Sequence, residues 1–184
     1  MPNWCENNIT ISHKDKKKIT EIAEVCMRDN PRLFNFIKPE PDWAKTPNDK
    51  GELPKLKDIK NSKGEFVMQV REFPDGSHDE RWYDWNYDNW GTKWDVSEFL
   101  DHEFIVNKQG SEYCLELSFW TAWSPPIAIY ETLFERGFGI SADYIERGMG
   151  YVGTWINGED LEYKFDDESM PKELKEMVEI PGYF

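Results

Sequence analysis

The chain has few of the residues that usually mark a chemical site or a secreted scaffold. Its 184 residues include three cysteines, Cys5, Cys26 and Cys114, which are odd in number, far apart and never in a CxxC pair. This spacing excludes a disulfide framework and a zinc ribbon, so we expect buried free thiols. The three histidines are equally scattered and form no HExxH or HxH pair, so no metal or other cofactor is predicted.

Long apolar runs and positive charge are also scarce. No apolar stretch approaches the roughly 18 residues of a membrane span, and the N-terminus lacks the basic and apolar regions of a signal peptide. A formal net charge of -14 opposes binding to phosphate backbones, which depends on lysine and arginine. We therefore expect a cytoplasmic protein that binds neither a membrane nor nucleic acid directly.

Aromatic residues, by contrast, are plentiful. They make up 15% of the chain and include nine tryptophans. Each buried aromatic side chain removes roughly 150–250 Å² of surface from water. We therefore expect a core built from few, large side chains, in a chain whose length suits a single domain.

The N-terminal stretch predicts a strand followed by a helix. In NWCENNITIS apolar and polar side chains alternate, which is typical of a strand with one buried face. Ser12 is a candidate N-cap, with Asp15 three residues later. Apolar residues then recur at helical spacing, and the helix is expected to end before Pro31.

The next stretch is typical of an insertion. Between Pro31 and Gly64, prolines, glycines and lysines are frequent, which disfavours both helices and strands and predicts a loop. Glu65–Phe73 alternates again and predicts a short strand or extended arm, and Pro74–Gly76 predicts a turn. We therefore expect an irregular insertion at about 31–101 within a single domain of residues 1–184.

The most clearly patterned strand is EYCLELSFW. Its apolar residues Leu115, Leu117 and Phe119 fall on one face. The following segment predicts a helix that is capped by Ser124, begins with a proline and ends at Gly137. Three residues of that helix should face the sheet: Ile127, Tyr130 and Phe134.

Three further strands, GISADYIERG, GYVGTWING and EDLEYKF, precede a short helix after Pro171. If Phe66–Arg71 or Phe104–Asn107 supplies the second strand, the order becomes strand, helix, strand, strand, helix, strand. This order predicts an α+β fold, a ferredoxin-like split βαβ antiparallel sheet with helices on one face, extra C-terminal strands and a large loop insertion. Residues from about 157 to 184 would form an acidic C-terminal extension. The second face of the sheet would carry Glu6, Asn8, Thr10, Glu116, Ser118 and Trp120.

Four stretches, MPNWCENNITI, LFNFIKPEP, WYDWNYDNWGTKWD and FWTAWSPP, occur in this order along the chain. Together they resemble a family of phage and plasmid proteins of unknown function that carry the YubB-type ferredoxin-like domain, including Api-like phage proteins. The resemblance spans residues 2 to about 153. It implies a ferredoxin-like fold and a phage or mobile-element origin, and it implies neither a reaction nor a catalytic residue.

The third of these stretches carries the candidate binding surface. Trp90 and Trp94, four residues apart, are predicted to share one face and to be buried. The first half of the stretch is predicted to present exposed rings beside acidic residues, a surface suited to a protein partner, a sugar or a cationic ligand. This candidate surface consists of Trp82, Tyr83, Asp84, Trp85, Tyr87 and Asp88.

We therefore interpret the chain as a phage or mobile-element accessory protein, a protein-interaction module that binds a host or phage protein through an acidic aromatic surface. One alternative is nucleic-acid mimicry, in which acidic residues concentrated in 75–101 and 159–179 occupy a basic site on a host protein.

A second alternative is a small enzyme. Pro2 would become N-terminal if Met1 were removed, and tautomerases use such a proline as a general base, with a cation such as Arg71 or Arg147 near the substrate carboxylate. The 36 acidic residues make carboxylate pairs commonplace, and no phosphate-binding loop or nucleophile elbow occurs. No catalytic residue is therefore predicted.

Overall fold

The structure, a computed structural model, describes residues 3–100 and 103–180. The chain divides into two compact units. The first, which we call the sheet unit, contains the residues up to Pro39 together with those from Tyr87 onward, and the second, the hairpin unit, is Glu40–Asn86. The hairpin unit lies inside the stretch 31–101 predicted to be an insertion, and the single domain of residues 1–184 stays a prediction.

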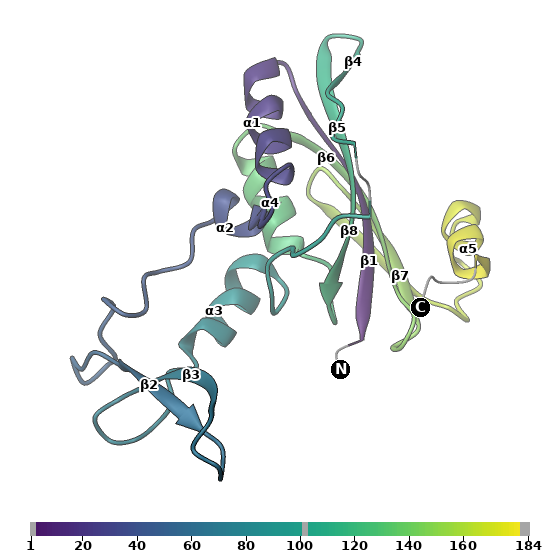
Figure 1. Cartoon of the computed structure of the whole chain (residues 1–184). Helices are drawn as coiled ribbons and strands as arrows, with labels where there is room; N and C mark the ends of the chain where they lie inside the picture. The colour runs from purple at the N-terminus through teal and green to yellow at the C-terminus, as the bar shows by residue number, and fades with distance from the viewer. Residues whose placement is uncertain (1–2, 101–102, 181–184) are drawn as a thin grey trace. The chain divides into compact units, whose positions relative to one another are not determined.

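Within the described residues, the sheet unit is built on six antiparallel strands in the order β4-β5-β1-β6-β7-β8 (Figure 1). The order β4-β5-β1-β6, with a helix after β1 and another after β5, is that of a split βαβ fold. The predicted α+β class is therefore confirmed, and β7 and β8 are the extra C-terminal strands. The strands are β1 Trp4–His13, β4 Asn107–Gln109, β5 Glu112–Ala122, β6 Gly139–Glu146, β7 Tyr151–Ile156 and β8 Glu159–Lys164.

The second strand of the split βαβ order is β4, which begins where the predicted Phe104–Asn107 strand ends. The other predicted source, Phe66–Arg71, belongs to the hairpin unit instead.

Strand β1 lies in the middle of the sheet. Its successive side chains point alternately to the two faces of the sheet. Ile9 lies opposite Leu117 of β5 and Ala142 of β6, and all three are buried. This face packs against α1 (Lys16–Cys26) and α4 (Ile127–Glu135), so we call it the helix-covered face (Figure 1). The predicted facing of the β5 residues is thereby confirmed, because Leu115, Leu117 and Phe119 are all buried.

Helix α1 begins one turn later than the predicted cap. Its N-cap is Asp15, whose carboxylate accepts the backbone N–H of Lys17 at 2.9 Å. The predicted cap, Ser12, is wrong. This residue lies in β1, and its hydroxyl donates a hydrogen bond to the carboxylate of Glu112 at 2.8 Å. An aspartate at this position satisfies an orphan helix N–H as well as a serine would.

Helix α4 also departs from the prediction at its start. Pro126 is the N-cap and makes no side-chain cap bond, and Ser124 instead donates its hydroxyl to the carbonyl of Gly91 at 2.7 Å. The predicted Ser124 cap is therefore wrong. Tyr130 is fully buried as expected, whereas Phe134 is 42% exposed, because the buried side of the helix is Ile129, Tyr130 and Leu133.

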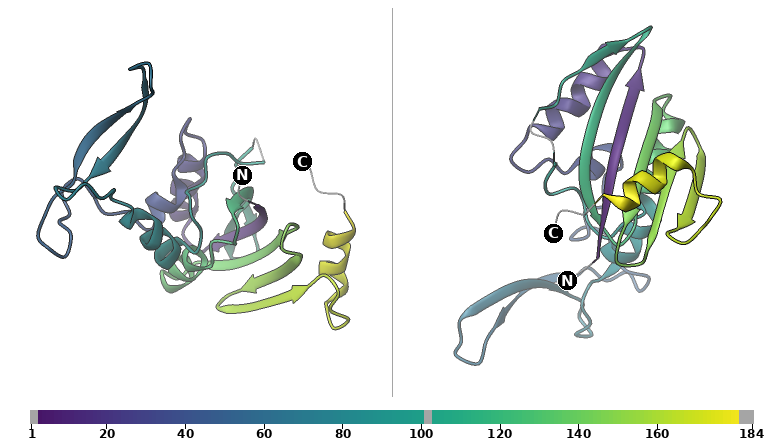
Figure 2. Two further views of the ribbon diagram at one scale, coloured as in Figure 1. Left: turned by 90° about the horizontal axis from the view of Figure 1, so that it is seen from below. Right: turned by 90° about the vertical axis from the view of Figure 1, so that its right-hand side faces the viewer.

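The C-terminal helix α5 (Lys172–Glu179) packs on the opposite face of the sheet. Its Leu174 joins a buried cluster with Ile145 of β6 and Val152 of β7, residues that alternate with those of the helix-covered face. Arg147 fastens the helix end by donating to the carbonyls of Met177 and Val178. In the right-hand view of Figure 2, α5 lies in front of the sheet, and β1 and β5 have no described helix in front of them.

The hairpin unit contains two antiparallel strands, β2 (Lys55–Lys60) and β3 (Phe66–Glu72). The predicted strand at Glu65–Phe73 is therefore confirmed. The loop predicted from Pro31 to Gly64 is wrong in two places, because it contains β2 and also the short helix α2 (Leu33–Ile37). Alternating lysines hide β2 from a hydrophobic pattern, since four of its six residues are charged.

A partly buried cation, Arg81, lies at the centre of the contacts within the hairpin unit. The guanidinium of Arg81 lies 4.9 Å from the ring centroid of Trp43 and 5.2 Å from that of Phe73. It pairs with Asp79 at 2.7 Å and donates to the carbonyl of Thr46 at 2.9 Å. Arginine suits this place because its planar head stacks on aromatic rings while its N–H groups form hydrogen bonds in the same plane.

No helix among the described residues is long and apolar enough to cross a membrane. The cysteines Cys5, Cys26 and Cys114 are free and buried, which confirms the expectation of buried thiols. Burial raises the pKa of the Cys26 thiol to about 12, so it is a poor nucleophile near neutral pH.

Candidate functional site

The predicted aromatic surface falls on α3 (Arg81–Trp90), a helix that begins in the hairpin unit and ends in the sheet unit. Asp84 and Asp88 are exposed and lie about one helical turn apart. The rings of Trp82 and Tyr83 meet edge to face, with centroids 5.8 Å apart. The four aromatic residues of the surface are half-buried: Trp82, Tyr83, Trp85 and Tyr87. The role of this surface in binding stays a prediction.

Trp90 and Trp94 do not form one buried pair. Trp90 is 2% exposed and donates its indole N–H to the carbonyl of Lys38 at 2.9 Å, as expected of a core residue. Trp94 is 40% exposed, so the prediction that it is buried is wrong. Gly91, with φ at 82°, follows the last residue of α3 and turns the chain out of the helix. Residues 90 and 94 therefore do not share a helix face.

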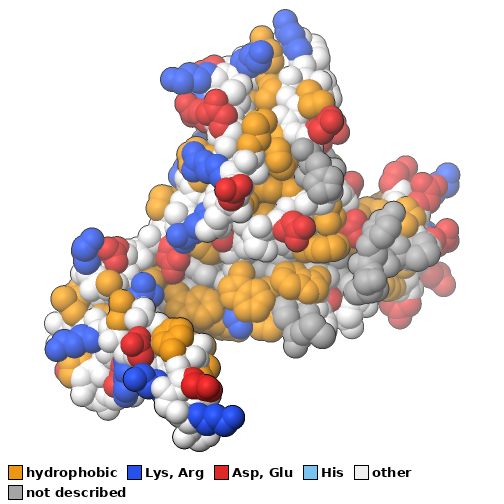
Figure 3. Space-filling model, in the orientation of Figure 1, with side chains coloured by type: hydrophobic (Ala, Val, Ile, Leu, Met, Phe, Trp, Pro, Cys, Tyr) orange, Lys and Arg blue, Asp and Glu red, His pale blue; other side chains and the backbone are white. Residues whose placement is uncertain are grey.

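Trp94 belongs instead to a group of four tryptophans at one end of the sheet, which we call the tryptophan cluster: Trp4, Trp94, Trp120 and Trp123. Ring centroids lie 6.3 Å apart for Trp4 and Trp94, and 6.4 Å apart for the stacked rings of Trp94 and Trp123. Trp4 is 43% exposed. Figure 3 shows hydrophobic side chains gathered near the start of β1.

Lys93 places a positive charge beside this cluster. Its ammonium lies 4.7 Å from the ring centroid of Trp94 and 4.8 Å from that of Trp123. A cation over a tryptophan face is attracted by the ring quadrupole, by about 0.5–1 kcal/mol at an exposed site. The faces of these two rings thus already contact one cation of the same chain, so a cationic group is chemically suited to them.

Hydrogen bonds fix the segment after α3 against the turn after β5. Besides the Ser124 bond to Gly91, the hydroxyl of Thr92 donates to the carbonyl of Ala122 at 2.9 Å. A Cβ atom on Gly91 would lie 2.9 Å from the backbone nitrogen of Ile127, so only glycine permits this approach. The two segments carry Trp94 and Trp123, whose relative position is therefore set by the backbone.

The backbone of Trp123 is strained. Its φ of 67° lies in the left-handed region, which is unusual for a bulky side chain. Its N–H donates to the carbonyl of Asn3 at 2.9 Å, and its own carbonyl accepts the hydroxyl of Tyr151 at 2.8 Å. Such strain costs of order 1–3 kcal/mol and persists only where the surroundings impose it. The two hydrogen bonds therefore hold the Trp123 ring in the cluster in a backbone conformation that lowers the free energy of unfolding.

A hollow of about 170 Å³ opens beside the cluster. Trp4, Trp94 and Trp120 supply most of its apolar wall, and Asp95 and Ser97 add polar atoms. A hollow of this size and lining suits one small group, such as the flat head or the apolar stem of a partner side chain.

The carboxylate of Asp95 is already engaged by the protein. It accepts backbone N–H groups from Phe34 at 2.7 Å, Asn35 at 2.9 Å and Val96 at 2.8 Å. Burial raises the pKa of this carboxyl, and the three N–H groups oppose that rise. Asp95 therefore anchors the start of α2 to the cluster.

Beyond the cluster, the face of the sheet opposite α1 and α4 carries acidic residues next to hydroxyl and amide groups, and we call it the open face. Its acidic residues are Glu6, Glu112, Glu116 and Asp143. No lysine or arginine occupies a position on this face in the described strands β1, β5, β6 and β7. Glu116 and Asp143 are exposed, so the open face presents negative charge that no cation of these strands neutralises.

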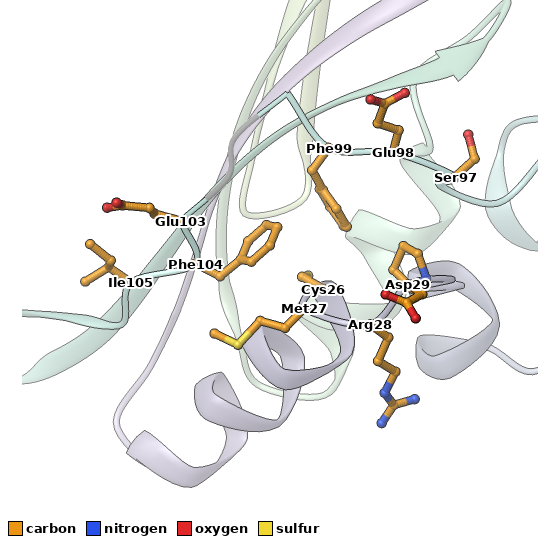
Figure 4. A pocket seen from close by; sticks show the side chains of 11 residues that line it. Cys26, Met27, Arg28, Asp29, Ser97, Glu98, Phe99, Glu103, Phe104 and Ile105 are labelled. Atoms are coloured by element: carbon orange, nitrogen blue, oxygen red, sulfur yellow. The ribbon is translucent and has the colours of Figure 1, made fainter.

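A separate groove of about 540 Å³ lies between the end of α1 and the segment 97–105. Phe99 and Phe104 point into it, whereas Glu98 and Glu103 point away (Figure 4). Residues 101–102 fall outside the described residues, and the groove is assigned no role.

The described residues do not test the tautomerase alternative. Pro2, the candidate general base, lies outside them. Of its candidate partners, Arg147 is engaged at the end of α5, and Arg71 lies on β3. No group of three or more histidine, cysteine, aspartate or glutamate side chains that could hold a metal ion occurs among the described residues.

No family model matches the chain, and no curated relative matches it. Among solved structures it is similar to the crystal structure of protein api92 from Yersinia pseudotuberculosis, of family DUF1281, at 11% identity and a TM-score of 0.40. The match covers 92% of this chain and 100% of that chain. Membership of the phage and plasmid family stays a prediction.

The sequence placed only Trp120 on the open face and did not reveal the other members of the cluster. Trp4, Trp94 and Trp123 come from three of the four stretches that carry the family resemblance. Their recurrence in separate stretches was a signal that these stretches meet in space.

Proposed function

We propose that the chain is a protein-interaction module whose sheet unit binds a positively charged segment of a partner protein. The observation that carries this proposal is the position of two exposed tryptophans, Trp4 and Trp94, at the end of a sheet face that bears carboxylates and, in the described strands β1, β5, β6 and β7, no lysine or arginine. As an accessory protein of a phage or mobile element, it would bind a host or phage protein in the cytoplasm of the host cell. The resemblance of the four sequence stretches supports that setting.

The chemistry of the surface favours arginine and lysine side chains. A guanidinium stacks on an indole ring and gains about 0.5–2 kcal/mol, while carboxylates such as Glu116 and Asp143 attract the charge from a distance. The hollow beside Trp4 and Trp94 would receive the apolar stem or head of one such side chain. The tryptophans supply affinity, and the acidic face steers the partner.

Calorimetric titration with a short arginine-rich peptide tests this proposal, with a glutamate-rich peptide of equal length as control. Only the arginine-rich peptide should bind, and binding should weaken as salt is raised. Replacing Trp94 with alanine should weaken binding by about tenfold, equivalent to about 1.4 kcal/mol. Trp85→Ala on α3 is the matched variant, because it removes an indole from the other candidate surface.

Loss of binding in Trp85→Ala, with Trp94→Ala unaffected, would move the binding surface to Trp82, Tyr83, Asp84, Trp85, Tyr87 and Asp88. If neither peptide binds, the proposed function is refuted.

A second candidate function, nucleic-acid mimicry, is favoured by the absence of cations from the described strand positions of the open face. A mimic should displace duplex DNA from the same arginine-rich peptide. The double variant Glu116→Gln with Asp143→Asn should lose that displacement, because it removes the charge that stands in for phosphate. Displacement that is equal in both proteins would argue against mimicry by this face.

A further inference from the structure

We propose that the hairpin β2–β3 of one molecule binds the open face of a second copy of the chain, so that the protein associates with itself. This inference rests on the proposed function, because it names one partner for the same acidic surface. It concerns two separate molecules.

The hairpin exposes apolar side chains that a lone two-stranded ribbon cannot bury. Leu56 pairs with Arg71 and Lys60 pairs with Phe66, and the register shifts between these two pairs at Ile59/Lys60. Leu56 and Phe66 are each 62% exposed. A two-stranded hairpin is at best marginally stable alone in water, and an exposed apolar patch on it is a contact surface.

The hairpin also differs in charge from the chain as a whole. Residues 53–72 contain five basic and three acidic residues, in a chain whose formal net charge is -14. Its lysines and arginine match the open face, where Glu116 and Asp143 are exposed. Two molecules of equal negative charge repel each other except where opposite patches meet, so charge selects this pairing.

The open face supplies apolar contacts as well. Trp4 is 43% exposed and Ile156 is 49% exposed, and both lie on the strand faces that point away from α1 and α4. Leu56 and Phe66 can pack on such residues while Lys60 and Arg71 meet the carboxylates. One such contact joins two molecules into a dimer.

Sedimentation velocity over a range of protein concentrations tests this inference. At low salt the wild type should dimerise, and added salt should weaken the dimer. The variant Lys60→Glu with Arg71→Glu and the variant Glu116→Lys with Asp143→Lys should each dimerise at least about tenfold more weakly. All four positions are exposed, so both variants should keep the fold, which circular dichroism checks. An equimolar mixture of the two variants should restore the dimer, because both pairings of opposite patches return: the acidic hairpin with the basic face, and the basic hairpin with the acidic face.

Apolar variants give a second test that leaves charge unchanged. Leu56→Ser with Phe66→Ser should weaken the dimer, whereas Met149→Ser, which is 65% exposed in the turn between β6 and β7, should not. A wild type that stays monomeric at low salt overturns the inference, as does a dimer that both charge variants retain. Binding of the arginine-rich peptide distinguishes failure of this inference from failure of the proposed function. If the protein stays monomeric but still binds the peptide, the proposed function stands and only self-association is refuted.

Discussion

The sheet unit and the hairpin unit are stabilised by different forces. The sheet unit buries large apolar rings, including Trp90, Trp155 and Phe119, between a six-stranded sheet and its helices. The hairpin unit surrounds one cation, Arg81, with two rings and a carboxylate, and its β-ribbon stays largely exposed. Side chains buried in one apolar core stabilise one another across the whole core. The hydrogen bonds of a single cation, by contrast, stabilise only the residues that it contacts. The hairpin unit should therefore open without unfolding the sheet unit.

The largest effect is expected from the core of the sheet unit. Trp90→Ala should lower the free energy of unfolding by about 3–5 kcal/mol, because it leaves a large cavity and removes the bond to the Lys38 carbonyl. Denaturant unfolding measures the change. Trp94→Ala is the matched control, and its cost should be much smaller because the ring is 40% exposed. Equal losses of unfolding free energy in the two variants would show that the exposure of each ring does not determine its contribution to stability.

A smaller and local effect is expected from the hairpin unit. Arg81→Ala should reduce the protection of amides in residues 40–86 by about 1–3 kcal/mol, since it leaves Asp79 and several carbonyls without their donor. Native-state hydrogen exchange measures this protection. Amides of β1 and β5 should keep theirs, and Lys63→Ala, at an exposed position, should change neither unit. Parallel loss of protection in both units would contradict their independence.

The same contrast should appear as pH is lowered. The Arg81 guanidinium beside Asp79 holds the pKa of that carboxyl below its ordinary value. The ion pair therefore stabilises the hairpin unit above about pH 3.9, the value for an unfolded aspartate, and this stabilisation is lost as pH falls through the lower folded pKa. Hydrogen exchange should be measured at pH 5 and again below about pH 3. Between these two conditions, the amides of residues 40–86 in the wild type should lose protection before those of the sheet unit. Asp79→Asn should show little further opening of these residues over that range.

The smallest effect is expected at the contact that positions the tryptophan cluster. Ser124→Ala should cost about 0.5–1.5 kcal/mol, because it removes one hydrogen bond to the Gly91 carbonyl. Denaturant unfolding measures the cost, with Ser141→Ala, on an exposed strand position, as control. In addition, Ser124→Ala should weaken binding of the arginine-rich peptide, since it loosens Trp94 against Trp123. A variant that loses stability but binds the peptide normally would show that this bond does not position the cluster.

The sheet could be predicted from the sequence because alternation repeats in β1, β5 and β6, where apolar residues such as Ile9, Leu117 and Ala142 lie opposite one another and are buried. Caps were harder to predict. Ser12 and Ser124 have the right chemistry, yet their hydroxyls serve contacts with residues distant in sequence, Glu112 and Gly91. Local patterns do not show such competition.

The binding surface was harder still to predict. The motif at residues 82–95 drew attention to one segment, whereas the tryptophan cluster is assembled from β1, the segment after α3 and the end of β5. The register of β1 with β5, in which Trp4 lies opposite Ala122, and the hydrogen bonds of Thr92 and Ser124 bring these segments together. Spacing within one segment therefore cannot reveal the cluster.

The stacked pair of Trp94 and Trp123 has a spectroscopic consequence. Two indoles with centroids 6.4 Å apart and planes inclined by 27° are close enough for their electronic transitions to couple. The coupling should produce a paired positive and negative band in the ultraviolet circular dichroism spectrum, which Trp94→Ala removes because Trp94 also forms the other close indole pair, with Trp4. Because a ligand that displaces either ring changes the angle between the transition dipoles, this band is an intrinsic reporter of occupancy that requires no label.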